Sequence, residues 1–246
     1  MDKKIVLVTG ASSGIGEAVA RRLARERYTV VLTGRNRSKL ETMARTMAGE
    51  GLRVVAIPGD ITVEAEVRSI VEESLKTFGT VNALVHSAGI FRMNPVEATP
   101  TEEFRQVMDT NLTSTYFLLK FLMPHFYKQG AGHIIALSSI AGKIGFPQET
   151  AYCASKWGLM GMLAALRMEA APRGVKVTAI LPGATLTPAW DTFTGELPAD
   201  RLMSAESVAD AVLFALSQPA AACVDELHLM PARDPFGGDK SSFKAK

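Results

Sequence analysis

The stretch Ile5-Val6-Leu7-Val8-Thr9, followed directly by Gly10-Ala11-Ser12-Ser13-Gly14-Ile15-Gly16, decides the fold. Four strongly apolar residues in a row are typical of a strand buried on both faces of a parallel sheet. After the glycines, Ile15, Val19 and Leu23 recur at helical spacing, which predicts a helix over 14–26. A strand that turns into a helix through a glycine-rich loop is the first half of a βαβ unit.

The same alternation continues along the whole chain. Further strands are predicted at 29–33, 53–58, 82–86, 132–138, 175–181 and 224–229. Helices are predicted at 38–50, 63–78, 100–128, 151–171 and 205–216. This order predicts an α/β fold: a doubly wound (Rossmann) parallel sheet of seven strands with helices on both faces and strand order 3-2-1-4-5-6-7. Because no repeat or low-complexity linker divides residues 1–246, we expect a single domain.

Helix ends and irregular stretches add detail. Thr99, Pro100 and Glu102 have the spacing of a capping box for the long helix, and Ser204 is the expected cap of the helix over 205–216. Residues 183–203 lack periodicity, and a loop of this length is usually functional, so we expect a substrate lid there. Residues 231–246 mix Pro, Gly, Lys and Ser and are expected to form a partly mobile tail.

Composition excludes several classes of protein. Lys plus Arg is 27 and Asp plus Glu is 25. The net charge of +2 lacks the excess of basic residues that is typical of nucleic-acid binding proteins. No apolar run has the length of a membrane helix, and the apolar run at the N-terminus is too short for a signal peptide. Two cysteines without metal-ligand spacing, Cys153 and Cys223, favour a reducing cytoplasm and no metal site.

The glycine loop predicts a phosphate site. Glycines at a strand-to-helix turn let the backbone approach a phosphate and offer N–H groups at a helix N-terminus. The spacing is Gly-x3-Gly-x-Gly, and the lysine of an NTPase phosphate loop is missing. A tight turn without ligand is one alternative. Another is the Gly-x-Ser-x-Gly elbow of a serine hydrolase, with Ser12 as nucleophile, although only one strand precedes it here.

Three residues suggest proton transfer. Tyr152 and Lys156 stand at i and i+4 and therefore share one face of a helix. A cation near a phenol favours the phenolate, so we expect Lys156 to lower the tyrosine pKa and fit Tyr152 for acid/base work on a carbonyl or an alcohol. Ser139 lies thirteen residues before the tyrosine, just past a predicted strand, at the edge where the active crevice of such a sheet forms.

Together these motifs resemble the short-chain dehydrogenase/reductase family over nearly the whole chain, with a likeness to its ketoacyl reductase-like members. The resemblance rests on Thr9–Gly16, Asp60, Ser87-Ala88-Gly89, Asn111, Ser139, Tyr152 with Lys156, and Pro182-Gly183 with Thr187. It implies a catalytic set of Asn111, Ser139, Tyr152 and Lys156. In it, Tyr152 is the acid/base, Ser139 bonds the substrate oxygen, Lys156 holds the nicotinamide ribose, and Asn111 positions a water of a proton relay.

The resemblance also implies the cofactor contacts. Asp60 would bond the adenine amino group and Thr187 the nicotinamide carboxamide. The full implied set is Gly10, Ser12, Ser13, Gly14, Ile15, Gly16, Arg35, Arg37, Asp60, Ile61, Ser87, Ala88, Gly89, Tyr152, Lys156, Pro182, Gly183, Thr185 and Thr187. Two departures bear on substrate and structure: the segment Leu227–Pro231 lacks the Gly-Gly ending common in ketoacyl-carrier-protein reductases, and His86 replaces the usual Asn. We interpret His86 as a buried, hydrogen-bonded histidine.

The residues after the second strand indicate which nicotinamide cofactor binds. Gly34 occupies the place where an NAD site carries an acid, and Arg35 follows it, with Arg37 nearby. A guanidinium suits a 2′-phosphate, and Thr33 and Asn36 could donate further hydrogen bonds. The sequence therefore favours NADP(H), with NAD(H) possible, unless both arginines are simply solvated charges.

The predicted function is interconversion of a carbonyl and an alcohol with NADP(H), most simply as a carbonyl reductase. An idle NADP-binding sensor or scaffold is the alternative from another class. The substrate, a small carbonyl or alcohol compound, stays open; its wall is expected from Phe91, Phe146 and Trp190, within the wider candidates 91–93, 144–149 and Phe193. The long helix and the tyrosine helix are expected to bury apolar faces in a homodimer or homotetramer.

Overall fold

The computed structural model describes residues 4–192 and 199–233. Its centre is an all-parallel sheet in the order β3-β2-β1-β4-β5-β6-β7, which confirms the predicted fold class and strand order. The strands are β1 (Ile5–Thr9), β2 (Thr29–Thr33), β3 (Val54–Ala56), β4 (Ala83–His86), β5 (Gly132–Leu137), β6 (Val175–Pro182) and β7 (Glu226–Leu229). The order reverses between β1 and β4, and this is where ligands bind in open sheets of this kind.

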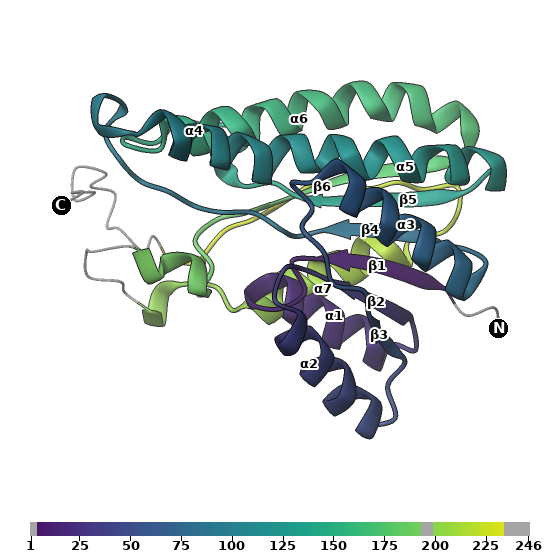
Figure 1. Ribbon diagram of the computed structural model, residues 1–246. Coiled ribbons are helices and arrows are strands. Elements are labelled where there is room, and N and C mark those ends of the chain that lie inside the picture. The colour runs from purple at the N-terminus through teal and green to yellow at the C-terminus, as the bar shows by residue number, and fades with distance from the viewer. Residues whose placement is uncertain (1–3, 193–198, 234–246) are drawn as a thin grey trace.

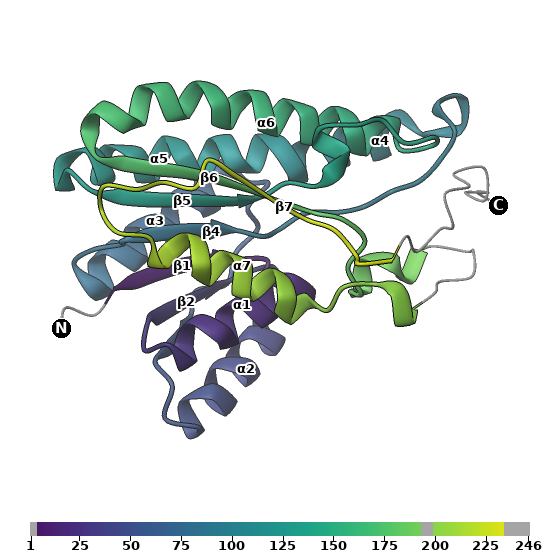
Figure 2. The ribbon, with the colours of Figure 1, turned by 180° about the vertical axis from the view of Figure 1, so that it is seen from behind.

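Helices cover both faces of the sheet (Figures 1 and 2). One face carries α1 (Gly14–Arg25), α2 (Arg37–Gly49) and α7 (Ala205–Ser217). The other carries α3 (Glu64–Phe78), α5 (Ser114–Gln129) and α6 (Thr150–Ala170), with α4 (Thr101–Met108) beside α6. Every residue of β1 is buried because the two apolar layers meet the sheet from opposite sides, which explains why its sequence is continuously apolar.

The predicted long helix over 100–128 is interrupted. A π-helical turn, Asp109–Thr113, separates α4 from α5. Single π turns inside α-helices are rare and are often found at functional sites. The predicted capping box is wrong: Pro100 stands at the cap position, and the Thr99 hydroxyl donates to the carbonyl of Pro95 at 3.0 Å. Thr99 is used to close the 3-10 turn Val96–Ala98, so its oxygen does not cap α4.

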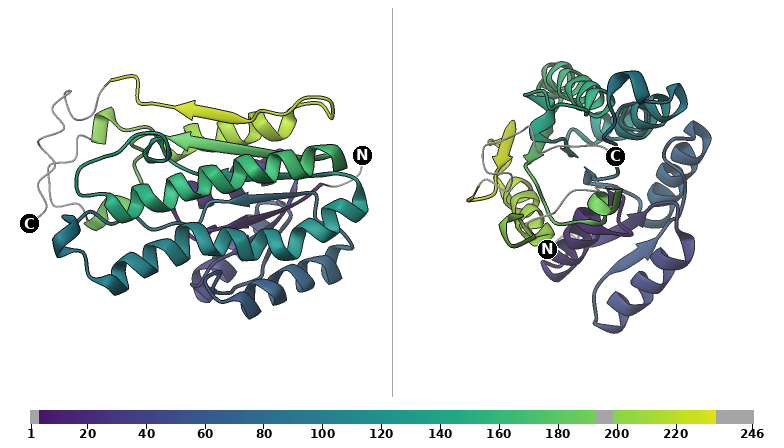
Figure 3. Two further views of the ribbon diagram at one scale, coloured as in Figure 1. Left: turned by 90° about the horizontal axis from the view of Figure 1, so that it is seen from above. Right: turned by 90° about the vertical axis from the view of Figure 1, so that its left-hand side faces the viewer.

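The expected lid, residues 183–203, follows β6 at the carboxyl end of the sheet, toward which the strand arrows point (Figure 3). It contains two short 3-10 helices, Pro188–Thr192 and Ala199–Arg201, and a bridge between Thr185 and Met203. Phe193 and most of the expected tail lie outside the described residues. Ser204 caps α7 as predicted, since its hydroxyl accepts from the Ser207 N–H at 3.2 Å. Within the described ranges, no helix combines the length and apolar character needed to cross a bilayer.

Candidate active site

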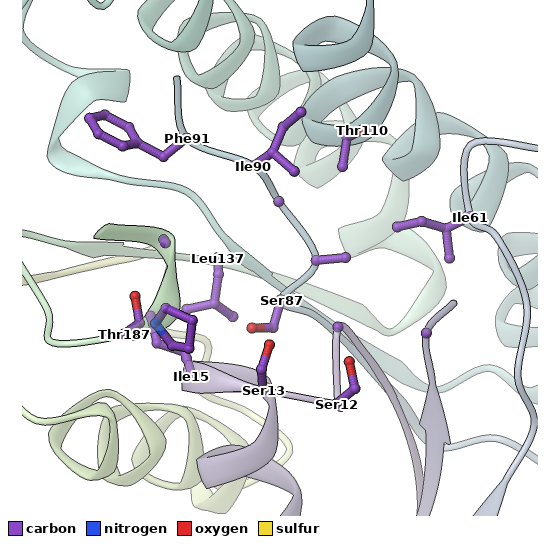
Figure 4. A pocket seen from close by; sticks show the side chains of 18 of the residues that line it. Ser12, Ser13, Ile15, Ile61, Ser87, Ile90, Phe91, Thr110, Leu137 and Thr187 are labelled. Atoms are coloured by element: carbon purple, nitrogen blue, oxygen red, sulfur yellow. The ribbon is translucent and has the colours of Figure 1, made fainter. Parts of the chain in front are cut away.

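A cavity of about 400 Å³ opens at the carboxyl edge of the sheet, where the order of the strands reverses (Figure 4). It joins the loops that follow β1, β2, β3 and β4 to the first turns of α6 and to the start of the lid. Fifteen of the predicted site residues line it: Gly10, Ser12, Ser13, Gly14, Ile15, Gly16, Arg35, Asp60, Ile61, Ser87, Ala88, Gly89, Tyr152, Lys156 and Thr187. Phe91, predicted for the substrate wall, lines it as well.

The glycine loop is shaped so that only glycine fits. Gly10 has a φ of +65°, and a Cβ there would lie 2.8 Å from the backbone of Ala88. A Cβ on Gly16 would lie 2.2 Å from the Gly10 carbonyl oxygen. The hydroxyls of Ser12, Ser13 and Ser87 face the space above this turn (Figure 4). With the N-terminus of α1 behind it, the loop forms a cradle that fits a pyrophosphate.

The two arginines that follow β2, Arg35 and Arg37, have different surroundings. Gly34 and Arg35 line the cavity, whereas Arg37 is exposed and lies 3.6 Å from Glu41 on its own helix. Two further donors predicted for this corner are engaged elsewhere. The Thr33 hydroxyl donates to the Ile57 carbonyl at 2.7 Å, and the Asn36 side chain caps α2 by accepting from the Lys39 N–H.

Tyr152 and Lys156 reach the cavity from the first turns of α6. The Lys156 ammonium donates to the Leu137 carbonyl at 2.8 Å and lies 5.7 Å from the centroid of the Tyr152 ring. Ser139 follows β5 and hydrogen-bonds to Tyr152, although its side chain is outside the cavity lining. The structure thus brings the three predicted residues together.

The pKa values do not follow the sequence-based expectation. Burial raises the pKa of Tyr152 to about 12, and the hydrogen bond from Ser139 only partly opposes this shift. Burial also lowers the pKa of Lys156 to about 8. The prediction that Lys156 lowers the tyrosine pKa is therefore wrong for this structure. The reason is that burial removes the phenolate from water and destabilises it, while the Lys156 ammonium is directed at the Leu137 carbonyl.

Asn111 lies in the π turn, behind the cavity wall. Its side-chain oxygen accepts from the Ile90 N–H at 2.8 Å, and its amide donates to the Ile90 carbonyl at 2.9 Å. The same amide donates to the Ser155 hydroxyl at 3.1 Å, which in turn donates to the Tyr152 carbonyl. Asn111 therefore connects the backbone of the loop after β4 to the first turn of α6.

His86 is buried and hydrogen-bonded, which confirms its interpretation as a structural histidine. Its Nδ1 pairs with the Thr9 hydroxyl at 2.8 Å, and its Nε2 lies 3.5 Å from the Ser114 hydroxyl. Burial, together with the nearby charge of Lys156, lowers its pKa to about 3. His86 therefore stays neutral under ordinary conditions.

The hydrolase alternative finds no support, because none of the four histidines hydrogen-bonds to Ser12 within the part of the chain that the structure describes. Their side chains pair instead with Thr9 and Ser114, with Thr80 and Val81, with Thr178, and with Glu226. A serine nucleophile needs an adjacent base.

Of the three side chains predicted for the substrate wall, Phe91 alone lines the cavity. The Phe91 ring meets the Tyr152 ring edge-on at 5.1 Å between centroids and the Trp190 ring at 5.4 Å. Trp190 and Phe146 do not themselves line the cavity; the Trp190 indole donates to the Thr185 carbonyl at 2.9 Å. Pro182, Gly183 and Thr185 also lie off the lining, where the Gly183 N–H donates to the Leu229 carbonyl.

The lining includes Gly34 and, from the wider wall candidates, Arg92, and it also includes residues that the sequence did not single out as site residues: Gly59, Thr62, Ile90, Thr110, Leu137, Ser138, Pro188 and Ala189. Most of them follow the ends of parallel strands, a position that could have signalled them. Thr110 gave no such signal, because it reaches the cavity only through the π turn. Among residues 4–192 and 199–233, no group of three His, Cys, Asp or Glu side chains is placed to hold a metal ion.

Known proteins resemble this chain in sequence. The family model for short chain dehydrogenases matches residues 4–197. An uncharacterized oxidoreductase of Staphylococcus haemolyticus is 33% identical over 94% of this chain and 98% of its own length. Glycine betaine reductase of Emericella nidulans is 34% identical over 95% of this chain, but the match spans only 19% of that larger protein.

Solved structures agree with the sequence comparisons. An alcohol dehydrogenase from Thermococcus sibiricus, complexed with 5-hydroxy-NADP, has a TM-score of 0.87 and 28% identity, covering 94% of this chain and 97% of that one. A variant of actinorhodin polyketide ketoreductase with NADPH has a TM-score of 0.86 and 28% identity, covering 97% of this chain and 98% of that one. The chain therefore belongs to the short-chain dehydrogenase/reductase family of NAD(P)-using oxidoreductases.

Proposed function

We propose that this protein is an NADP(H)-dependent oxidoreductase that reduces a carbonyl compound to an alcohol. One observation carries the proposal: Tyr152 and Lys156 line the same cavity as the glycine loop and Arg35. A proton donor and a dinucleotide cradle thus share one cavity. That arrangement brings a carbonyl, held at Tyr152, next to a nicotinamide.

The cavity fits the cofactor. The loop Gly10–Gly16 would hold the pyrophosphate at the N-terminus of α1, because its tight turn, which a Cβ at Gly10 or Gly16 would disrupt, brings the backbone close to the cavity. Asp60 and Ile61 would contact the adenine, and Ser87, Ala88, Gly89 and Lys156 the sugars. Thr187, with Pro182, Gly183 and Thr185 behind it, would meet the nicotinamide. When bound, the reduced cofactor supplies the hydride.

Arg35 supports NADP(H) over NAD(H). Its guanidinium is the cation at the end of β2 that lines the cavity. Gly34 has no side chain at the position where an NAD site carries an acid, so no carboxylate there would repel a 2′-phosphate. The structural neighbours complexed with 5-hydroxy-NADP and NADPH point the same way. We expect NAD(H) to be accepted more weakly.

Tyr152 would supply the proton. Its hydroxyl donates to the carbonyl oxygen of the substrate, while Ser139 hydrogen-bonds to that oxygen and steadies the developing negative charge. A pKa of about 12 keeps the proton on Tyr152 at neutral pH, which is the state needed for reduction. Lys156 would place a positive charge below the tyrosine as it ionises, and Asn111 would support a water through which the proton is replaced.

The alternative function is that of an idle NADP-binding sensor or scaffold, which an experiment must distinguish from an active reductase. Lys156 is buried, and burial lowers its pKa to about 8. Burying a lysine destabilises the fold, and this cost is explained if the lysine takes part in catalysis but not if the protein only binds NADP. Lys156 therefore supports an enzyme. The experiment is to follow NADPH oxidation with a panel of ketones, aldehydes and acyl thioesters, and to measure NADPH binding by fluorescence. Binding without turnover across the panel would favour the sensor.

We also propose a homodimer or homotetramer of this chain. Large apolar side chains on α4, α5 and α6 are exposed: Phe104, Tyr116, Trp157 and Met168, the last at 79%. Exposed large apolar side chains are common at interfaces between subunits. The two free cysteines fit the reducing cytoplasm that the sequence favours. The expected partner is a small carbonyl or alcohol compound, not a nucleic acid or a membrane.

A further inference from the structure

The cavity carries more positive than negative side chains. Among the described residues that line it, the cations are Arg35, Arg92 and Lys156, and the only acid is Asp60. The proposed cofactor contacts use Arg35 at the 2′-phosphate, Lys156 at a ribose and Asp60 at the adenine. Arg92 is the charged residue of this lining that they leave unused. A guanidinium suits a carboxylate or a phosphate, so Arg92 is a candidate anion site.

Arg92 belongs to the substrate end of the cavity. It directly follows Phe91, which lines the cavity as well (Figure 4), and the Phe91 ring meets the Tyr152 ring edge-on at 5.1 Å between centroids. Two residues further along, the Asn94 N–H donates to the Gln148 carbonyl at 2.8 Å. This bond ties the segment to the loop before Tyr152. Arg92 therefore stands in the chain between two contacts to the region around the proposed proton donor.

The guanidinium of Arg92 is held close to this region. Its Nη1 donates to the Phe91 carbonyl at 2.8 Å, so the side chain folds back along its own segment. The side chain is 33% exposed, which leaves it accessible but partly shielded from water. Partial shielding strengthens a charge contact, and a side chain that is already held loses less freedom when it binds a ligand.

Glu103 is the acid beside Arg92, and it leaves donors of the guanidinium unoccupied. The Arg92 Nε lies 3.9 Å from the Glu103 carboxylate, which is beyond hydrogen-bond distance. The other oxygen of that carboxylate accepts from the Asn94 side-chain amide at 2.7 Å. Within the part of the chain that the structure describes, the bond to the Phe91 carbonyl is the only hydrogen bond of the guanidinium. Further N–H groups of its planar fork therefore remain for a ligand.

We propose that Arg92 binds an anionic oxygen group of the substrate, so that the preferred substrate is an aldehyde or ketone that carries a carboxylate or a phosphate. This inference rests on the proposed function. The guanidinium fork donates two parallel hydrogen bonds to either group. Phe91, whose ring contacts Tyr152, packs against the apolar part that joins the anion to the carbonyl. The chemistry is unchanged: the cofactor hydride adds to the carbonyl carbon and the Tyr152 proton to the oxygen.

The test compares aldehydes that differ in charge. 4-Formylbenzoate and 4-formylbenzamide have nearly the same shape, and only the first is an anion. With saturating NADPH, kcat/KM should be higher for the carboxylate by roughly 10- to 100-fold, the range of a charge-assisted contact. The 3-formyl isomers repeat the comparison with the charge nearer the carbonyl. 4-Formylphenyl phosphate in the same assay shows whether a phosphate or a carboxylate is the better group.

Variants of Arg92 show whether its charge is the cause. In Arg92→Gln the ratio of kcat/KM for the anion to that for the amide should fall by roughly 10-fold or more, and a general loss of activity cancels in this ratio. Arg92→Lys keeps the charge without the fork and should retain part of the preference. Arg105→Gln is the matched control, because it removes an exposed arginine, 3.9 Å from Glu102 on α4, and should keep the parent ratio.

A second measurement needs no anionic substrate. With saturating NADPH and a neutral carbonyl compound that the parent reduces, benzoate or phenyl phosphate should inhibit competitively and benzamide much more weakly. Arg92→Gln should lose this inhibition. If the parent reduces neither the anionic nor the neutral aldehydes, this measurement decides: inhibition by neither anion overturns the inference.

The inference is also overturned if the parent prefers the amides or reduces both classes equally. A ratio that is unchanged in Arg92→Gln contradicts it, and so does an equal fall in Arg105→Gln, which would show a general effect of net charge. Failure of the proposed function is distinct, because then the parent reduces no carbonyl compound at all.

Discussion

The side-chain amide of Asn111 holds the backbone of Ile90 at both of its polar groups, accepting from the N–H at 2.8 Å and donating to the carbonyl at 2.9 Å. The π turn makes this possible, because the extra residue turns Asn111 inward from a helix that otherwise runs along the sheet. Since Phe91 follows Ile90 directly, this clamp fixes the aromatic wall relative to Tyr152.

Replacing Asn111 should therefore damage both stability and activity. Asn111→Ala leaves two partly buried backbone groups of Ile90 without this partner, each worth at most about 1–3 kcal/mol, so the free energy of unfolding in urea should fall by up to a few kcal/mol. The kcat should fall as well, while NADPH binding is weakened less. Thr113→Ala is the matched control, because it removes an exposed hydrogen bond to Asp109 in the same turn and should change little. Equal effects of the two substitutions would refute the clamp.

His86 should make the protein sensitive to acid. Its pKa is lowered from 6.5 to about 3 in the folded state, so between these values the unfolded chain binds more protons and stability falls as pH falls. Thermal unfolding between about pH 7 and about pH 4 should show a smaller loss of Tm in His86→Asn than in the parent. Some loss should remain, because burial also lowers the pKa of His133, to about 4. An unchanged slope in the variant would show that His86 is not the group responsible.

Much of this molecule could be predicted from its sequence because the deciding signals are local. The apolar run before Gly10 and the glycine spacing after it specify a strand, a turn and a helix without reference to the rest of the chain. The interruption at Asn111 could not be predicted, since a π turn leaves no periodic signature and depends on the contact with Ile90. The pKa of Tyr152 was predicted in the wrong direction because burial depends on the whole fold, whereas the spacing to Lys156 shows only the attraction.

Arg35 and Arg37 form a natural pair for testing cofactor choice. Arg35→Ala should weaken NADPH by roughly 10- to 150-fold in kcat/KM, the range of one charge-assisted contact, and should affect NADH little, since NADH has no 2′-phosphate. Arg37→Ala removes the same charge from an exposed residue paired with Glu41 and should have little effect on either cofactor. Both cofactors must be compared at one ionic strength, because salt screens exposed charges. Equal weakening of NADPH and NADH in Arg35→Ala would refute this assignment.

The exposed apolar residues on the helices around Tyr152 predict self-association. One chain has a mass of 26.4 kDa, and light scattering at micromolar concentration should give about two or four times that mass. Trp157→Glu places a charge on the proposed interface and should shift the mass toward one chain. Val63→Glu, an exposed apolar residue at the start of α3, is the control that should leave the mass unchanged. A parent protein that stays at the mass of one chain would exclude the proposed assembly.

The proton donor is the centre of the proposed mechanism, and Tyr152→Phe tests it most directly because it removes one oxygen atom and keeps the ring that packs against Phe91. The measurement is NADPH oxidation with a carbonyl compound that the parent reduces, alongside NADPH binding to the same variant. Binding should be retained, and kcat should fall by roughly 10²- to 10⁴-fold through the loss of proton transfer. Turnover within a few-fold of the parent would contradict the role given to Tyr152.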